Sequence, residues 1–191
     1  MRFRHEEVAS EWHQLLASAL TPASVFDEPK IPPSQTDGNP TWSQAELRGD
    51  VAANGFWTRG TVAIFDVRVT DTDAASNAST DPAKVLKRHE AEKKRKYGHR
   101  CEQSNRHFTP LVYSVDGLEG GEARAARKRL ASRLAAKWHR NYSALCGFVR
   151  ARLAFALVRA TSRCLRGTRD PTLERAPPLE WVSGTGSRLL A

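Results

Sequence analysis

The chain has 191 residues, of which 30 are Lys or Arg and 21 are Asp or Glu, so its formal net charge is +9. This length suits one domain with a hydrophobic core and is too short for two ordinary domains. The three cysteines show no zinc-ligand spacing, and no apolar run approaches the roughly 20 residues of a membrane span. These features exclude a zinc finger, a disulfide framework and a membrane partner, and we expect an intracellular chain.

The charge is distributed unevenly along the sequence. Residues 1–50 carry 8 Asp or Glu against 4 Lys or Arg, whereas residues 119–169 carry 13 Lys or Arg against 2 Asp or Glu. Residues 84–106 are also basic, with 9 Lys or Arg against 3 acidic residues. A concentrated positive charge attracts a polyanion from a distance. A nucleic acid is therefore the leading partner.

The first half of the chain predicts one helix and three strands. Apolar residues at helical spacing predict an amphipathic helix over residues 4–20, and residues 24–27 are expected to form a short strand. Four prolines and an Asp-Gly-Asn run predict a loop over residues 29–40. Alternating apolar residues then predict strands over 47–53 and 62–70, and the Asn-Gly pair between them indicates a hairpin.

The second half reads as three basic helices and one buried strand. After a polar loop, a long charged helix is expected over residues 84–104, followed by a strand over 108–115. Two further helices are predicted over 119–139 and 143–166, the last with Ser143 and Gly167 as caps.

Three charged side chains stand out in this pattern. Asp50 and Asp66 fall on neighbouring predicted strands, and carboxylates so placed can share a divalent metal. Asp66 lies within an apolar strand, where a carboxylate needs a counter-charge or a cation. At about 100° per residue, Lys93 lies at the centre of the inward face of the next helix. A lysine there can handle a water or a developing phosphate charge, so the set suits phosphodiester cleavage.

These elements and motifs resemble a nuclease family. The order helix, strand, strand, strand, helix, strand is similar to the core of PD-(D/E)XK nucleases. More narrowly, it resembles the restriction-like endonuclease domain that closes the polyprotein of certain site-specific non-LTR retrotransposons and related reverse-transcriptase reading frames. The matching motifs are Arg4-His5 for an Arg/Lys-His pair, Gly49-Asp50 for Pro-Asp, Asp66 for the acidic strand residue, Lys93-Lys94-Arg95-Lys96-Tyr97 for a Lys-x-x-Lys-Tyr run, and Phe108 to Leu118 for the apolar strand and turn that follow.

The resemblance implies a fold class and a domain plan. The fold would be α/β (α+β), a restriction-endonuclease-like core with a small mixed sheet flanked by helices. Residues 1–120 would form this core, and residues 121–167 a basic helical extension packed on it. Residues 168–191 would be a loosely ordered tail. By the same comparison the chain looks like a fragment, or the decayed end, of a longer element.

The resemblance also implies an activity, the Mg²⁺- or Mn²⁺-dependent nicking of target DNA for a retroelement. Asp50 and Asp66, with Glu11 or Glu7, would hold the metal, and Lys93 would act beside them. The residues expected to bind phosphate or DNA are Arg68, Lys96, Tyr97, Lys94 and His5. The basic helices would hold the backbone of a DNA duplex, with the element's RNA as a second partner. A dimer would allow both strands to be cut, and in a eukaryote the site of action would be the nucleus.

Two departures from the family pattern leave an alternative open. Gly49 replaces the family's proline, which shapes only the backbone. Arg68 stands where the general pattern has lysine, and an arginine is a poor proton shuttle because it stays charged. Either Lys93 or Lys96 has taken over that role, or the chain is a degenerate nuclease that binds nucleic acid without cutting it. In that reading Asp50 caps a turn and Asp66 forms a structural ion pair.

Overall fold

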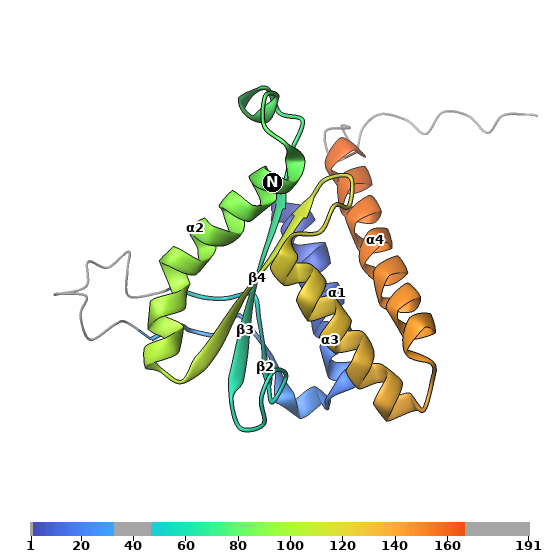
Figure 1. Ribbon diagram of the computed structural model, residues 1–191. Coiled ribbons are helices and arrows are strands. Elements are labelled where there is room, and N and C mark those ends of the chain that lie inside the picture. Colours follow the sequence, from blue (N-terminus) through green and yellow to red (C-terminus); the bar gives the residue numbers. More distant parts are fainter. Residues whose placement is uncertain (1, 33–46, 167–191) are drawn as a thin grey trace, which may run out of the picture.

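The computed structural model describes residues 2–32 and 47–166, and most of the predicted proline-rich loop and the predicted tail lie outside these ranges (Figure 1). The elements, in chain order, are α1 (Arg2–Ala19), η1 (Pro22–Ser24), β1 (Val25–Asp27), β2 (Val51–Asn54), β3 (Val62–Thr70), η2 (Ala75–Asn77), α2 (Pro82–Gln103), β4 (Arg106–Ser114), α3 (Gly121–Trp138) and α4 (Tyr142–Arg166). The two short η elements are 3₁₀ turns. The predicted order of helices and strands is confirmed.

The four strands form one mixed sheet in the order β1-β2-β3-β4. The strands β1 and β2 pair antiparallel, as do β2 and β3, and the predicted hairpin between β2 and β3 is therefore confirmed. The last two strands, β3 and β4, pair in parallel, with Asp66 opposite Pro110. Parallel neighbours need a crossover connection, which α2 provides.

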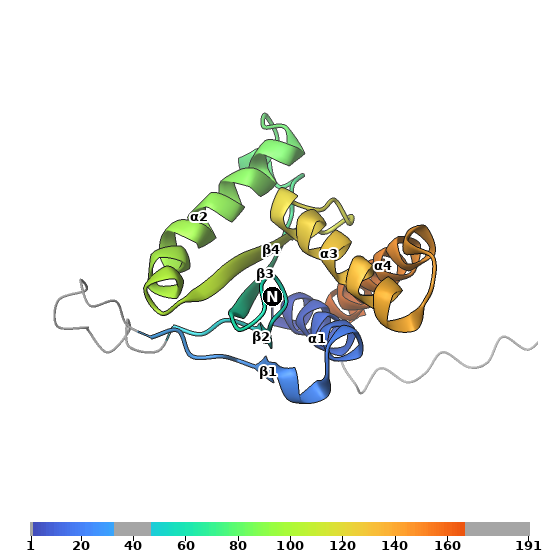
Figure 2. The same ribbon diagram turned by 60° about the horizontal axis from the view of Figure 1, so that its bottom comes forward.

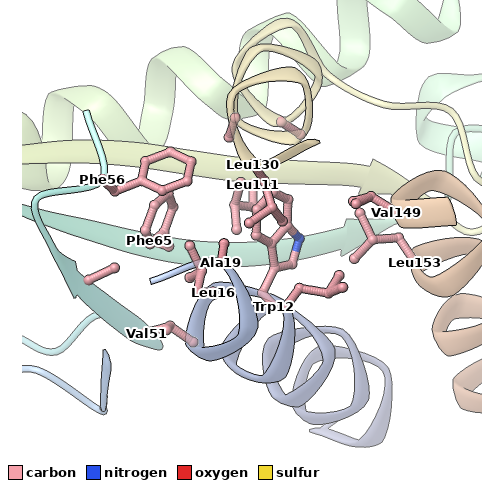
Figure 3. Packing of buried hydrophobic residues seen from close by; sticks show 14 of the residues in the cluster. Trp12, Leu16, Ala19, Val51, Phe56, Phe65, Leu111, Leu130, Val149 and Leu153 are labelled. Atoms are coloured by element: carbon pink, nitrogen blue, oxygen red, sulfur yellow. The ribbon is translucent and has the colours of Figure 1, made fainter. Parts of the chain in front are cut away.

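Helices cover both faces of this sheet (Figures 1 and 2). The helix α2 lies on one face and α1, α3 and α4 on the other. The larger hydrophobic cluster fills the second face, where Trp12, Phe65, Leu130 and Val149 are buried together (Figure 3). The Trp12 indole N–H donates a 3.0 Å hydrogen bond to the buried Tyr113 hydroxyl. This polar link inside the apolar layer satisfies both groups.

A smaller cluster lies between the sheet and α2. It contains Ile64 from β3, Tyr97 from α2 and Phe108 from β4. Successive strand side chains point to opposite faces, so Ile64 and Asp66 face α2 while Phe65 faces α1. The predicted alternation along this strand thus sets the side on which Asp66 lies.

The helices α3 and α4 share the main core. Their buried residues Leu130, Leu134, Val149 and Leu153 belong to the same cluster as Trp12. The hydrophobic core therefore crosses residue 120, where the sequence suggested a boundary between a nuclease core and a helical extension. Within the described ranges, no helix combines the length and hydropathy needed to cross a membrane.

Several element ends differ from their predicted positions. Strand β2 begins at Val51, later than expected, and α2 begins at Pro82 because the Asp81 carboxylate accepts hydrogen bonds from the first N–H groups of that helix. The first turn of α4 is capped by Asn141, whose Oδ1 accepts from the Ser143 N–H at 2.8 Å, and Ser143 is not the cap. Gly167, the predicted cap at the other end, lies outside the described residues. The loop before α2 contains a 3₁₀ turn at Ala75–Asn77.

Candidate functional site

Four charged or polar side chains from four separate segments of the chain lie close together beside the sheet. His5 comes from α1, Asp50 from the residue before β2, Asp66 from β3 and Lys93 from α2. His5 Nε2 lies 2.8 Å from Asp50 Oδ2, and Lys93 Nζ lies 2.5 Å from Asp66 Oδ2. The negative charge of Asp50 raises the pKa of Asp66, so the two pairs interact. We call these four residues the Asp50–Asp66 cluster.

Asp50 is held in place directly before β2 begins. Its backbone N–H donates to the Phe65 carbonyl at 2.9 Å, and its carboxylate Oδ2 accepts from the Val67 N–H at 2.5 Å. The β2–β3 ladder ends at the pair Val51–Phe65, and Asp50 lies directly before it. Burial raises the pKa of Asp66 and the charge of Asp50 adds to this rise, so the two carboxylates interact, while a metal shared between them stays a prediction.

Asp66 is the most buried member, with 4% of its surface exposed. Its Oδ2 atom makes no hydrogen bond of good geometry, and its close contact is the ion pair with Lys93. Burial raises the pKa of Asp66, the Lys93 ammonium opposes this rise, and the Asp50 charge adds to it. A buried carboxylate in this position is stabilised by a neighbouring cation.

His5 holds Asp50. The hydrogen bond to Asp50 is the main cause that raises the pKa of His5, and desolvation acts in the opposite direction. The sequence suggested that His5 binds phosphate. In the structure its Nε2 atom contacts the Asp50 carboxylate, and the phosphate contact of His5 stays a prediction.

The other predicted phosphate-binding residues lie on the α2 side. Arg68 Nη1 donates to Glu92 Oε2 at 2.9 Å, and the Lys94 ammonium pairs with Glu122 of α3. Lys96 is exposed, with its ammonium 5.0 Å from the centroid of the Tyr97 ring.

Tyr97 lies on the inward face of α2. Its side chain is 6% exposed and its ring packs against Phe108, with 5.2 Å between the ring centroids. In place of the predicted phosphate contact, Tyr97 has a packing role in the smaller cluster. A Tyr next to a basic run on an inward helix face is equally compatible with packing.

Glu11 does not join the cluster, and this corrects the predicted ligand set. Its carboxylate is buried and paired with Arg152 Nε at 2.5 Å and with Arg159 Nη2 at 3.5 Å, both on α4. Six residues separate Glu11 from His5, which is about 240° around a helix, so the two side chains point in different directions. Glu7, the alternative ligand, also pairs with α4, through Arg159 and Arg163.

An open groove lies beside Asp50, between α1 and the first strand. It has a volume of about 440 Å³ and is lined in part by His5, His13, Asp27 and Asp50. His13 Nδ1 lies 2.5 Å from Asp27 Oδ1, so the groove contains a second His–Asp pair. Solvent and small ions can reach Asp50 through this groove.

The cluster offers two oxygen ligands for a metal. Among the residues that the structure describes, no three His, Cys, Asp or Glu side chains gather as a metal-binding group. The two carboxylates nevertheless fit Mg²⁺, because it prefers oxygen ligands and keeps several waters. The repulsion between Asp50 and Asp66, which adds to the effect of burial in raising the pKa of Asp66, is what a divalent cation would relieve.

Comparison with known proteins adds no family. The sequence matches no protein-family model and no curated protein. A function for the chain is therefore inferred from the geometry of the cluster and from the charge around it.

Proposed function

We propose that the chain is a Mg²⁺- or Mn²⁺-dependent DNA endonuclease of the restriction-like type, the target-nicking domain of a retroelement. The observation that supports this most is the convergence of His5, Asp50, Asp66 and Lys93 from four separate segments of the chain. Their order along the chain and their elements match the motifs of the family that the sequence resembles.

Each residue of the cluster has a distinct role in this proposal. Asp50 and Asp66 would hold the metal, which supplies Lewis acidity toward the phosphate and the attacking water. The His5 hydrogen bond keeps the Asp50 carboxylate turned toward Asp66. The Lys93 ammonium, in contact with Asp66, would offset the charge that develops on the phosphate.

The duplex would contact basic side chains outside the cluster. On α3 and α4, Arg124, Lys128 and Arg150 are exposed. Contacts from such residues to phosphates are independent of sequence and weaken as salt is added. The same surface would accept the element's RNA, and in a eukaryotic cell the protein would act in the nucleus. A dimer would be needed to cut both strands in one event.

A catalytically inactive nucleic-acid-binding module is the second candidate, and one observation favours it. Each carboxylate of the cluster already has protein partners, because Asp50 accepts from Val67 and contacts His5, and Asp66 pairs with Lys93. A degenerate nuclease would keep this network as a structural ion-pair system. Duplex binding without cleavage would be its signature.

A plasmid-nicking assay tests the proposal. We expect the parent chain to nick supercoiled DNA in Mg²⁺ but not in EDTA. We expect Asp66→Asn and Lys93→Ala to reduce the nicking rate by about 100-fold or more, because each removes a group that acts on the transition state. Nicking that survives Asp66→Asn would contradict the catalytic assignment.

The matched control is Glu11→Gln, which makes the same kind of change in a buried acid outside the cluster. It should lower stability by about 1–3 kcal/mol, since it weakens a buried charged hydrogen bond, and leave nicking per folded molecule unchanged. Duplex binding is measured in parallel for the parent and for Asp66→Asn. Binding without any parental nicking would favour the inactive module.

A further inference from the structure

Two ion pairs link β3 to α2 side by side. Asp66 pairs with Lys93, and Arg68 pairs with Glu92. Asp66 and Arg68 share one face of the strand because they are two residues apart, and Glu92 and Lys93 are consecutive on the helix. The strand supplies the acid of the first pair and the base of the second, and the helix supplies the opposite partner in each. The Arg68 guanidinium is therefore held next to the Asp66–Lys93 pair of the cluster.

Glu92 is itself anchored. His89 is 7% exposed, and its Nδ1 lies 3.1 Å from Glu92 Oε2, the same oxygen that accepts from Arg68. On its other side the His89 ring reaches Thr70, with Nε2 3.4 Å from Oγ1. The hydrogen bonds from His89 and then Arg68 lower the pKa of Glu92, so its carboxylate is charged. A buried ring therefore fixes the acid that holds Arg68.

Arg68 keeps most of its hydrogen-bonding capacity. A guanidinium has five N–H donors in a planar fork, and the bond to Glu92 uses Nη1. The Arg68 side chain is 34% exposed, so a ligand can reach part of it. Such a fork matches the oxygens of a phosphate in a bidentate manner, but only if its plane is oriented correctly.

We propose that Glu92 is a positioning residue, which His89 anchors and which orients the Arg68 guanidinium toward a DNA phosphate beside the Asp50–Asp66 cluster. This inference rests on the DNA-binding part of the proposed function and does not require cleavage. It predicts that loss of the Glu92 charge weakens DNA binding, whereas removing an acid from a site for a polyanion ordinarily tightens binding.

The experiment measures the affinity for a short DNA duplex in EDTA, over a series of salt concentrations. Arg68→Ala should weaken binding about 5- to 10-fold and lower the slope of log K against log salt by about 1, since one phosphate contact is lost. Glu92→Gln should weaken binding about 3-fold although it adds positive net charge, since the fork is no longer oriented. In the Arg68→Ala background, Glu92→Gln should not weaken binding at all, because the two act through one contact.

The matched control is Glu119→Gln. Glu119 accepts two hydrogen bonds from Arg127 Nε, at 2.7 and 3.0 Å, so this variant also removes the acid of an Arg–Glu pair. It should leave the affinity unchanged or slightly tighter. Thermal unfolding of every variant shows that the proteins compared are folded.

The outcomes separate this inference from the nuclease proposal. If Glu92→Gln tightens binding as the control does, or weakens it equally in both backgrounds, the positioning role is refuted. If Glu92→Gln gives either of these results and the parent chain still nicks DNA, only the positioning role is refuted and the nuclease proposal stands. Coupling between Arg68 and Glu92 without any nicking refutes the nuclease alone, and a parent chain that does not bind duplex DNA refutes both.

Discussion

At the scale of single residues, the cluster is a balance between burial and charge. Burial favours the neutral form of Asp66 and thereby raises its pKa, and the adjacent Asp50 charge acts in the same direction. The Lys93 ammonium opposes both. A dication between the carboxylates would have the same sign as Lys93 and twice its charge, so metal binding and the Lys93 pair act on Asp66 in the same direction.

The pairing of His5 with Asp50 predicts a pH-dependent contribution to stability. The folded-state pKa of His5 lies above its ordinary value of 6.5, mainly because of the hydrogen bond to Asp50. A raised histidine pKa means that the native state holds the proton more tightly. The stabilisation is therefore complete below pH 6.5 and is lost as the pH rises through the folded-state pKa.

We expect the difference in unfolding free energy between the parent and His5→Gln to shrink as the pH is raised from about 5.5 to about 8.5, the range in which histidines titrate. Urea denaturation in EDTA measures it. In an Asp50→Asn background the pH dependence of this difference should disappear. Stability curves of parent and variant that stay parallel over the whole range would show that the contact contributes no linkage.

The residues of the site differ in how far the sequence could predict them. Asp66 and Lys93 follow from strand alternation and helix periodicity, which place a side chain on a face, whereas Asp50 lies just outside β2. The partner of Glu11 lies 141 positions away, at Arg152, and such a pairing depends on how α1 packs against α4. One signal was available, since Glu7 and Glu11 and the arginines of α4 both recur at helical spacing. Glu92 carried no such signal.

At the scale of elements, the start of β2 shows how the backbone presents Asp50. The Gly49 N–H donates to the Pro29 carbonyl at 3.0 Å, and the N–H of the next residue, Asp50, donates to the Phe65 carbonyl at 2.9 Å. A Cβ atom at position 49 would lie 2.4 Å from Ile64 Cγ2. The proline that the resembled family has at this position would lack the N–H group. This backbone therefore requires glycine at position 49, although the sequence suggested that the exchange of proline for glycine matters little.

Substitution of Gly49 should consequently damage both stability and activity. Gly49→Ala forces Ile64 or the β2 backbone to move, and overpacking of this kind costs about 1–3 kcal/mol. Because the displaced backbone carries Asp50, we expect nicking to fall as well. Urea denaturation and the plasmid assay measure the two effects.

Gly98→Ala is the matched control for this element. Gly98 lies within α2, where an added Cβ meets no atom within 4 Å. Alanine in a helix interior is favoured over glycine, so this variant should be neutral or more stable by about 0.5–1 kcal/mol. Equal stabilities for the two alanine variants would contradict the account of Gly49.

At the scale of the whole molecule, part of the basic charge serves the fold. Arg129 and Arg133 of α3 donate to backbone carbonyls of the β2–β3 turn, including that of Phe56 at 3.3 and 3.0 Å. Lys137 donates to the Ser18 and Leu20 carbonyls at the end of α1, both at 2.7 Å. Net charge counted from the sequence therefore overstates the charge available to a polyanion, because composition does not distinguish a cation that caps a loop from one that faces solvent.

The way in which the helices share one hydrophobic core determines whether the first 120 residues can form a domain by themselves. Helical and strand periodicity predicted each element, because each buries one face. They did not show which elements share that burial. Leu130, Leu134, Val149 and Leu153, from α3 and α4, pack in one cluster with Trp12 and Phe65. Each such side chain contributes about 1.5–3 kcal/mol on burial, so four of them rival the 5–15 kcal/mol that typically stabilises a whole domain.

A chain that ends at residue 120 should therefore fail to fold. We expect it to lack a cooperative urea transition and to show little dispersion in its amide NMR spectrum, whereas the full chain unfolds cooperatively. Milder variants test the same point without truncation, since Leu134→Ala and Val149→Ala should each cost about 2–4 kcal/mol through cavities in the shared core. If the 120-residue chain unfolds cooperatively and these substitutions cost little, the first 120 residues form an independent core and the last two helices are an accessory layer.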